Sequence, residues 1–80
     1  MTRAYVLITT EPGKTEAVQQ ALQGKPGVRA ADMIIGPYDV IAAVEAADLN
    51  AVGKLVLQEI RGISGVTNTL TCAVVERTSS

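Results

Sequence analysis

The segment Gly36-Pro37-Tyr38-Asp39 places a phenol and a carboxylate beside a glycine. A glycine has no side chain, so its backbone can approach a small ligand closely, and the two polar side chains could then hold that ligand. The same four residues also fit an ordinary β-turn, because proline presets φ at the first central position and aspartate is common in turns. The segment is therefore both a candidate binding loop and a candidate turn.

A row of hydroxyl groups lies near the end of the chain. Thr67, Thr69 and Thr71 occupy alternate positions, so a regular strand would place all three on one face. Hydroxyls donate and accept hydrogen bonds and could bind a small polar ligand. The alternative interpretation is that threonine is simply favoured in a half-exposed strand.

Few other residues could carry chemistry. The chain has no histidine and one cysteine, Cys72, which excludes His-based metal sites, an intrachain disulfide and a Cys–His nucleophilic pair. Cys72 falls on the apolar face of the last expected strand, so we expect it to be a small buried core residue. The carboxylates form no evident cluster, and no glycine-rich phosphate loop is present. No catalytic residue, metal ligand or cofactor is therefore predicted.

Composition narrows the class of protein further. The 80 residues suffice for one domain, and Lys+Arg 7 against Asp+Glu 8 gives a formal net charge of -1. A nucleic-acid-binding protein normally carries a concentrated basic surface, so direct nucleic-acid binding is not expected. No apolar run approaches the roughly 20 residues of a membrane span, and the N-terminus lacks the layout of a signal peptide. We expect a cytoplasmic protein that does not interact with membranes.

Aromatic residues are scarce, because the chain has no tryptophan, no phenylalanine and only two tyrosines. Its apolar positions are mostly alanine and valine. A small domain buries only about 60% of its unfolded surface, and small side chains give little stabilisation for each residue buried. We therefore expect self-association to supply part of the stability.

Hydrophobic periodicity and turn residues predict the secondary structure of the first half of the chain. A strand over 4–10 is rich in β-branched residues, and a Pro-Gly pair marks the turn after it. An amphipathic helix over 14–23 ends at Gly24, and a second strand spans 28–35. The order of this half is strand, helix, strand.

The second half has the same order. A strand over 40–45 follows so short a connection that it must form a β-hairpin with the strand before it. Asp48 is a good N-cap for a helix from Leu49 to about Arg61, and the last strand spans 66–76. An approximate internal repeat of the two halves supports this division.

The complete order is β-α-β-β-α-β. Right-handed crossovers interleave two β-α-β halves into an α+β, ferredoxin-like sandwich, in which a four-stranded antiparallel sheet carries both helices on one face. Residues 1–76 are expected to form this single domain, with 77–80 as a flexible C-terminal tail.

This arrangement leaves one face of the sheet without helices. Alternate strand residues must point to that face, and we expect them to include Tyr5, Leu7, Met33, Ile41 and Ala43. An uncovered apolar face of this size is typical of an interface. We therefore expect a homodimer that pairs the two sheets face to face.

These motifs, in this order, resemble the effector-binding domain of the Lrp/AsnC family of feast/famine transcriptional regulators, also called the RAM domain. The resemblance covers nearly the whole chain. Residues 4–8 are similar to the first strand of the family, and the Pro-Gly pair at 12–13 is similar to its pre-helix turn. Gly36-Pro37-Tyr38-Asp39 resembles its G-x-Y/F-D hairpin, and residues 65–71 resemble its G-V-x-x-S/T-x-T signature.

The resemblance implies an assembly of the dimeric α/β-barrel type, in which domains pair through their sheets and dimers associate into rings. It also implies that a small effector, usually an amino acid, binds between dimers. The ligand-binding residues that it implies are Gly36, Tyr38, Asp39, Thr69 and Thr71. An α-ammonium group needs acceptors such as the Asp39 carboxylate, and an α-carboxylate needs donors such as threonine hydroxyls and backbone N–H groups. Alternatively, Asp39 only caps its own turn.

Full-length members of the family also carry an N-terminal helix-turn-helix domain, whereas this sequence resembles only their C-terminal half. The resemblance therefore implies a stand-alone regulatory module for ligand binding and oligomerisation. Such a module would not bind DNA itself and could co-assemble with full-length Lrp/AsnC regulators.

Two other functions share the expected fold. Cofactor-free monooxygenases and small isomerases also use dimeric α/β barrels, but their pockets are usually lined by His, Asn, Trp or Phe, of which this chain has only two asparagines. An ACT-like regulatory domain has the same element order and also binds amino acids, and the G-x-Y-D segment favours the RAM domain over it. We therefore expect no enzyme activity.

Overall fold

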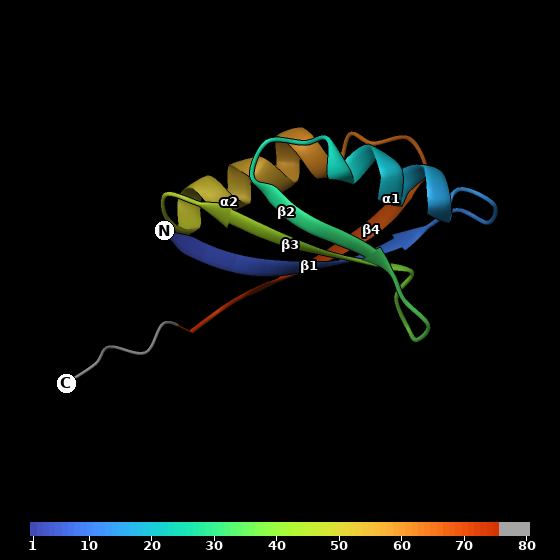
Figure 1. Ribbon diagram of the computed structural model, residues 1–80, viewed down its shortest axis with the longest axis horizontal. Helices are drawn as coiled ribbons and strands as arrows, with labels where there is room; N and C mark the ends of the chain where they lie inside the picture. The colour runs from blue at the N-terminus through green and yellow to red at the C-terminus, as the bar shows by residue number, and fades with distance from the viewer. Residues whose placement is uncertain (76–80) are drawn as a thin grey trace.

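The computed structural model describes residues 1–75, and residues 76–80 lie outside the described part of the chain. The expected end of the last strand at Glu76 and the expected tail over 77–80 therefore fall outside it. The elements follow the predicted order, with a short π-helical segment, η1, added directly after α2 (Figure 1). They are β1 (Thr2–Thr10), α1 (Thr15–Gln23), β2 (Val28–Met33), β3 (Val40–Ala46), α2 (Leu49–Leu55), η1 (Val56–Ile60) and β4 (Val66–Ala73).

The four strands form one antiparallel sheet in the order β2-β3-β1-β4. The central strands are therefore β1 and β3, and the edge strands are β2 and β4. Figure 1 shows both helices on the same side of this sheet. The expected ferredoxin-like sandwich is confirmed, because two β-α-β halves interleave with their helices on one face.

Small aliphatic side chains fill the space between the sheet and the helices. Among the described residues, the buried core contains only alanine, valine, leucine and isoleucine, and no polar side chain is buried. The buried residues are Ala4, Val6, Ile8, Val18, Leu22, Ala31, Val40, Ala42, Val44, Val52, Val56 and Ile60. Because these side chains are small, each contributes modestly to the hydrophobic stabilisation.

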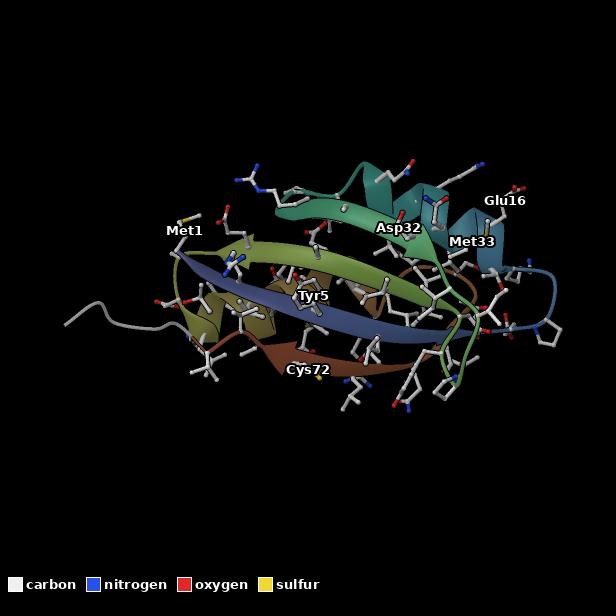
Figure 2. All side chains as sticks on the ribbon, turned by 60° about the horizontal axis from the view of Figure 1, so that its bottom comes forward. Met1, Tyr5, Glu16, Asp32, Met33 and Cys72 are labelled. Atoms are coloured by element: carbon white, nitrogen blue, oxygen red, sulfur yellow. The ribbon has the colours of Figure 1, made fainter. Side chains whose placement is uncertain are left out.

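The opposite face of the sheet, which we call the open face, carries no helix. Buried residues of β1 alternate with Tyr5 and Leu7, so these two side chains point to the open face. Figure 2 shows Tyr5 on this face. The strand register adds neighbours from β3 and β4, and Tyr5 and Leu70 are 44% and 45% exposed. The apolar centre of the open face consists of Tyr5, Leu7, Ile41, Ala43, Leu70 and Cys72.

The expectation that Met33 belongs to the open face is wrong. Met33 pairs with Val40, whose buried side chain lies on the helix side, so Met33 points to that side as well. Asp32 pairs with Ile41 instead and takes the open-face position. A register shift near the start of β2 changes which residues of this strand face the helices.

The second helix begins at the predicted residue. Oδ1 of Asp48 accepts a hydrogen bond from the backbone N–H of Ala51 at 2.8 Å, which caps the first turn. The helix then widens into η1 and does not continue as an α-helix to Arg61. Val52, Val56 and Ile60 are buried against the sheet, whereas Leu49, the first residue of the helix, is 62% exposed. No helix among the described residues is long and apolar enough to cross a membrane.

Candidate functional site

The candidate binding loop connects β2 to β3 and comprises residues 34–39. It is longer than the expected tight turn, because β2 ends two residues earlier than predicted. The backbone N–H of Ile34 donates to the carbonyl oxygen of Asp39 at 2.9 Å, which closes the loop at its base. Gly36 is exposed, whereas Tyr38 and Asp39 are half-buried. The loop therefore presents the Gly36 backbone to solvent while its second half contacts the fold.

The Asp39 carboxylate joins this loop to the end of β1. Its Oδ2 atom accepts a hydrogen bond from the backbone N–H of Thr10 at 2.8 Å and lies 3.4 Å from the Thr10 hydroxyl. The backbone N–H of Asp39 donates to the carbonyl oxygen of Ile8 at 2.9 Å. The Thr10 hydroxyl also shares a hydrogen bond of 2.7 Å with the Thr15 hydroxyl at the start of α1. Asp39 thus makes a structural contact, which holds the loop at one end of the sheet.

The threonines of β4 are divided between the two faces of the sheet. Thr69 and Thr71 pair with buried residues of β1, so their side chains lie on the helix side. Thr67 is on the open face, where its Oγ1 atom is 2.8 Å from Oγ1 of Thr9. The register of β1 and β4 shifts after Thr9. The prediction that all three threonines share one face is therefore wrong for Thr67, because a strand irregularity reverses the alternation.

The candidate ligand-binding residues do not gather around one cavity in the described chain, because β1 lies between them. Ile8 accepts the hydrogen bond of Asp39 on one side and pairs with Thr69 on the other. Adjacent strands are about 4.8 Å apart, so roughly 10 Å separates the backbones of Asp39 and Thr69. Thr71 lies two residues farther along β4. The loop and Thr69 share one end of the sheet without touching.

Cys72 is exposed, so the expectation of a buried core position is wrong. It pairs with Tyr5 and therefore belongs to the open face, which no helix covers. The face of β4 that carries Cys72 is apolar, as the sequence indicated, but it is the face that points away from the core. In residues 1–75, no group of three or more His, Cys, Asp or Glu side chains is placed to hold a metal ion.

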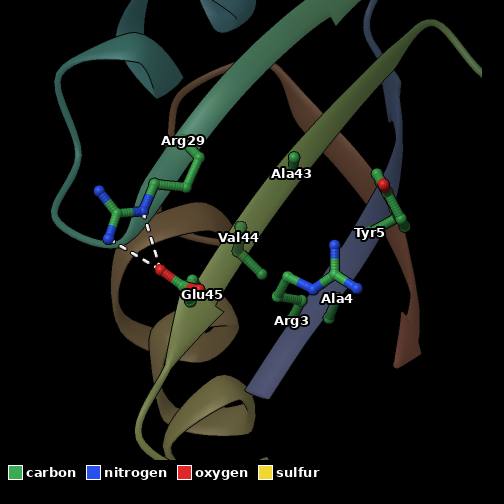
Figure 3. Close-up of a pocket in the computed structure, with 7 residues that line it drawn as sticks. All are labelled: Arg3, Ala4, Tyr5, Arg29, Ala43, Val44 and Glu45. Carbon is green, nitrogen blue, oxygen red and sulfur yellow. Dashed lines mark hydrogen bonds and ion pairs between the residues drawn. The ribbon is translucent and has the colours of Figure 1, made fainter. Parts of the chain in front are cut away.

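A hollow of about 190 Å³, which the sequence analysis did not predict, lies on the open face (Figure 3). Nε and Nη2 of Arg29 donate to Oε1 of Glu45 at 3.1 and 2.8 Å, beside this hollow. The Arg29 side chain is 68% exposed and that of Glu45 is 24% exposed. The residues that line the hollow are Arg3, Ala4, Tyr5, Arg29, Ala43, Val44 and Glu45. No local sequence signal marks this hollow, because its lining residues come from three different strands, β1, β2 and β3.

A family model of the Lrp/AsnC ligand binding domain matches residues 3–80 of this chain. The chain belongs to the Lrp/AsnC ligand-binding domain family. The resemblance inferred from the G-x-Y-D loop and the β4 signature is therefore confirmed.

Two curated relatives of this chain are proteins of different kinds. An uncharacterised HTH-type transcriptional regulator of Pyrococcus furiosus is 37% identical over 73 residues, which cover 88% of this chain and 49% of the regulator. A homocitrate synthase of Sulfurisphaera tokodaii is 38% identical over 63 residues, which cover 79% of this chain and 14% of the enzyme. The chain thus spans about half the length of the regulator and a small part of the enzyme.

Solved structures agree with the Lrp/AsnC fold. A crystal structure from Thermus thermophilus superposes with a TM-score of 0.90 at 29% sequence identity, and the alignment covers 100% of both chains. A transcriptional regulator from Neisseria meningitidis, solved as a complex with L-methionine, superposes with a TM-score of 0.81 at 17% identity. That alignment covers 99% of this chain and 53% of the regulator, and at this identity it shows the fold alone.

Proposed function

We propose that this chain is the effector-binding and oligomerisation module of an Lrp/AsnC-type regulatory system, and that its effector is an amino acid. Membership of the ligand-binding domain family supports effector binding. The methionine complex of the Neisseria regulator gives the ligand class of one protein with the same fold. Related stretches occur in a transcriptional regulator and in an enzyme, so what they share is the domain itself. That distribution favours a binding role for the domain.

The loop offers groups that complement one half of an amino acid zwitterion. Both contacts of Asp39 with Thr10 use Oδ2, so Oδ1 is the oxygen that can accept from an α-ammonium group. The exposed backbone of Gly36 can approach the ligand closely, and the Tyr38 hydroxyl adds a donor.

The observation that carries the proposal is the separation of this loop from Thr69 and Thr71 in one chain. Asp39 and Thr69 lie on opposite sides of β1, with roughly 10 Å between their backbones, and Thr71 lies farther along β4. A second copy that brings its Thr69 and Thr71 hydroxyls against the loop would supply donors for the α-carboxylate. Effector binding would then favour the assembled state over the separate chains.

The open face supplies the surface for the first step of this assembly. Its centre is apolar and uncovered, and Tyr5 and Leu70 are nearly half exposed in the single chain. Pairing of two sheets would bury that surface in a homodimer, and dimers would meet through the effector loops in a larger ring. The same surfaces would allow co-assembly with full-length Lrp/AsnC regulators.

The proposed role is regulatory and not catalytic. The relative that aligns over 88% of this chain is a regulator, whereas the alignment with homocitrate synthase covers 14% of that enzyme. The chain also has no histidine, which the enzymes of similar fold commonly use. A net charge of -1 is not the excess of basic residues that nucleic-acid-binding proteins normally carry, so the proposal includes no direct nucleic-acid contact. A cytoplasmic location belongs to the proposal, because the similar regulators act on transcription.

A thermal-shift screen against the proteinogenic amino acids tests this function. At a ligand concentration of about 100 times the Kd, an effector should add about 2.7 kcal/mol to the free energy of unfolding and raise the Tm. Asp39→Ala and the pair Thr69→Val, Thr71→Val should lose this stabilisation. Thr67→Val is the matched control, because Thr67 lies on the other face and the variant should keep the response. Stabilisation by no amino acid, or an unchanged response in Asp39→Ala, would contradict the proposal.

A further inference from the structure

The outer side of α2 and η1 carries an apolar groove of about 460 Å³. Leu49 and Leu57 border it and are 62% and 61% exposed, and Gly53 lies between them in the sequence. Asn50 and Lys54 complete its lining. These residues recur at spacings of three and four positions, so they share one side of the helix. Two large apolar side chains thus flank a position that has no side chain at all.

The packing of the described residues gives no reason for a glycine at position 53. No atom lies within 4 Å of the place that a Cβ atom of Gly53 would take, and its φ is not positive. A glycine inside a helix is less stable than an alanine, because its backbone loses more conformational freedom on folding. What a glycine permits is the close approach of another backbone. Gly53 therefore points to a partner on the outside of the helix.

The charge beside the groove favours an acidic occupant. Lys54 is the one charged residue among those that line it, and Lys54 forms no ion pair within residues 1–75. The residues three and four positions away from Lys54 include no carboxylate, and Glu59 of η1 is half-buried and does not line the groove. A carboxylate on the occupant would supply the ion pair that the chain itself does not provide.

A second copy of the same helix does not meet this requirement. Two α2 helices that packed antiparallel across Gly53 would bring their Lys54 side chains to one contact, because Lys54 directly follows the centre of the pair. A parallel pair would also align Lys54 with Lys54. Like charges at such a contact destabilise it, and no acidic residue of the lining offsets them. The groove accordingly favours a helix of a different protein.

We propose that this groove docks an amphipathic helix of a partner protein, with a large apolar side chain against Gly53 and a carboxylate beside Lys54. In this mode of recognition, the apolar face of the partner helix packs into the groove through anchors three or four residues apart. One short helix offers only a small contact area, so we expect the docking to be weak and reversible.

The docking groove is separate from the surfaces of the proposed function. It uses no residue of the candidate binding loop and none of the open face. The helices and the open face lie on opposite sides of the sheet (Figure 1), so a dimer through the open face would leave the groove of each copy accessible. The proposal therefore does not rest on effector binding, and the two can fail independently.

Titration of the isotope-labelled protein with synthetic helices, followed by NMR, tests the proposal. Two peptides of about three heptads share one stripe of leucine and alanine and differ only in its flanks, which are glutamate in one and lysine in the other. We expect the glutamate peptide to shift the amide signals of Gly53 and Lys54 saturably. The lysine peptide should bind at least about tenfold more weakly. Added salt should reduce this difference, because it screens the charge contact.

Variants locate the docking site. Gly53→Gln fills the groove with a polar side chain and should weaken binding of the glutamate peptide at least about tenfold. The same variant should raise the Tm of the free protein, because glutamine favours a helix and its Cβ atom meets no other atom there. Lys54→Gln should weaken binding, and Lys54→Arg should retain it. Lys14→Gln is the matched control, because it removes an exposed cation before α1 and should leave binding unchanged.

Three results would overturn the docking proposal. They are equal binding of the two peptides, the absence of a saturable shift at Gly53 and Lys54, and equal effects of Lys54→Gln and Lys14→Gln. Sedimentation equilibrium tests the second copy as the alternative occupant. Gly53→Gln should associate as the wild type does, and its dissociation would show that α2 pairs with another copy of itself, which would also overturn the proposal. Asp39→Ala should bind the glutamate peptide normally, whatever its effect on the effector response.

Discussion

Oδ2 of Asp39 accepts a hydrogen bond of 2.8 Å from the backbone N–H of Thr10, although 29 residues separate the two in the sequence. The contact connects the candidate binding loop to a central strand of the sheet. Thr10 in turn meets Thr15 at the start of α1 through a hydrogen bond of 2.7 Å between their hydroxyls. A ligand that binds the Asp39 carboxylate would therefore affect contacts of the loop, β1 and α1 together. Effector binding and fold stability should accordingly be linked at this residue.

Two substitutions of Asp39 distinguish the contribution of its hydrogen bond to stability from the contribution of its charge. We expect Asp39→Ala to lower the free energy of unfolding by about 1–3 kcal/mol, because the part-buried N–H of Thr10 loses its acceptor. Asp39→Asn keeps an acceptor oxygen and should cost less than about 1 kcal/mol. Urea denaturation of both variants at one fixed protein concentration measures the difference. Equal losses in the two variants would show that the charge, and not the hydrogen bond, stabilises the loop.

A second prediction concerns the close approach of two elements at Gly65. Its φ is +100°, and a Cβ atom there would lie 2.8 Å from Cβ of Lys14 and 3.1 Å from Cγ2 of Val18. Gly65→Ala should therefore destabilise the protein by about 2–4 kcal/mol, through backbone strain and overpacking together. Gly13→Ala is the matched control, because Gly13 has a φ of +80° but no atom lies within 4 Å of the place that its new methyl group would take. It should show the backbone cost alone, about 1–2 kcal/mol, in the same denaturation experiment.

The order of the elements could be predicted from the sequence because its signals are local. The Asp48 cap, the Pro-Gly turn and the β-branched run of β1 each act within a few neighbouring residues. The face of the sheet to which each strand side chain points could not be predicted as well as the order of the elements. Both faces of this sheet are apolar, so alternation does not reveal which side of β2 carries Met33. Irregularities after Thr9 and near Ala30 then shift the alternation without a local sequence signal.

For the candidate sites, too, the sequence predicted local features but not the contacts between strands. The Gly36–Asp39 loop could be recognised because its four residues are contiguous. Its contact with Thr10 and its distance from Thr69 depend on the pairing of β1 with β3 and β4, which the sequence does not specify residue by residue. The hollow beside Tyr5 was missed for the same reason, since its lining residues meet only after these strands have paired.

The cap of α2 gives a third prediction. The Asp48 carboxylate accepts a hydrogen bond from the backbone N–H of Ala51 at 2.8 Å. The helix that begins there, α2, is short, because the π-helical segment η1 follows it directly. Asp48→Ala should lower the free energy of unfolding by about 1 kcal/mol. Asp48→Asn keeps a side-chain acceptor of nearly equal capping strength and should stay close to the wild type. Thermal unfolding of the three proteins by circular dichroism checks this, and a large loss in Asp48→Asn would point to the charge instead of the cap.

A fourth prediction concerns assembly through the open face. Leu70 pairs with Leu7 at the centre of this face, so in a face-to-face dimer its side chain would be removed from water. A lysine at that position would place an unpaired charge in an apolar interface, which costs far more than the lost hydrophobic contact. Leu49 offers a comparison, because it is an equally large side chain that is also exposed but lies on α2.

Sedimentation equilibrium at matched concentrations distinguishes the two surfaces. Leu70→Lys should raise the dimer dissociation constant by at least about a hundredfold, which corresponds to about 2.8 kcal/mol. Leu49→Lys should sediment as the wild type does, because the outer side of α2 is not part of the proposed sheet-to-sheet interface. A wild-type protein that sediments only as an 8.3 kDa species would contradict the dimer itself. Dissociation caused by Leu49→Lys and not by Leu70→Lys would move the interface from the open face to the helices, and the hollow beside Tyr5 would then face solvent in the assembled protein.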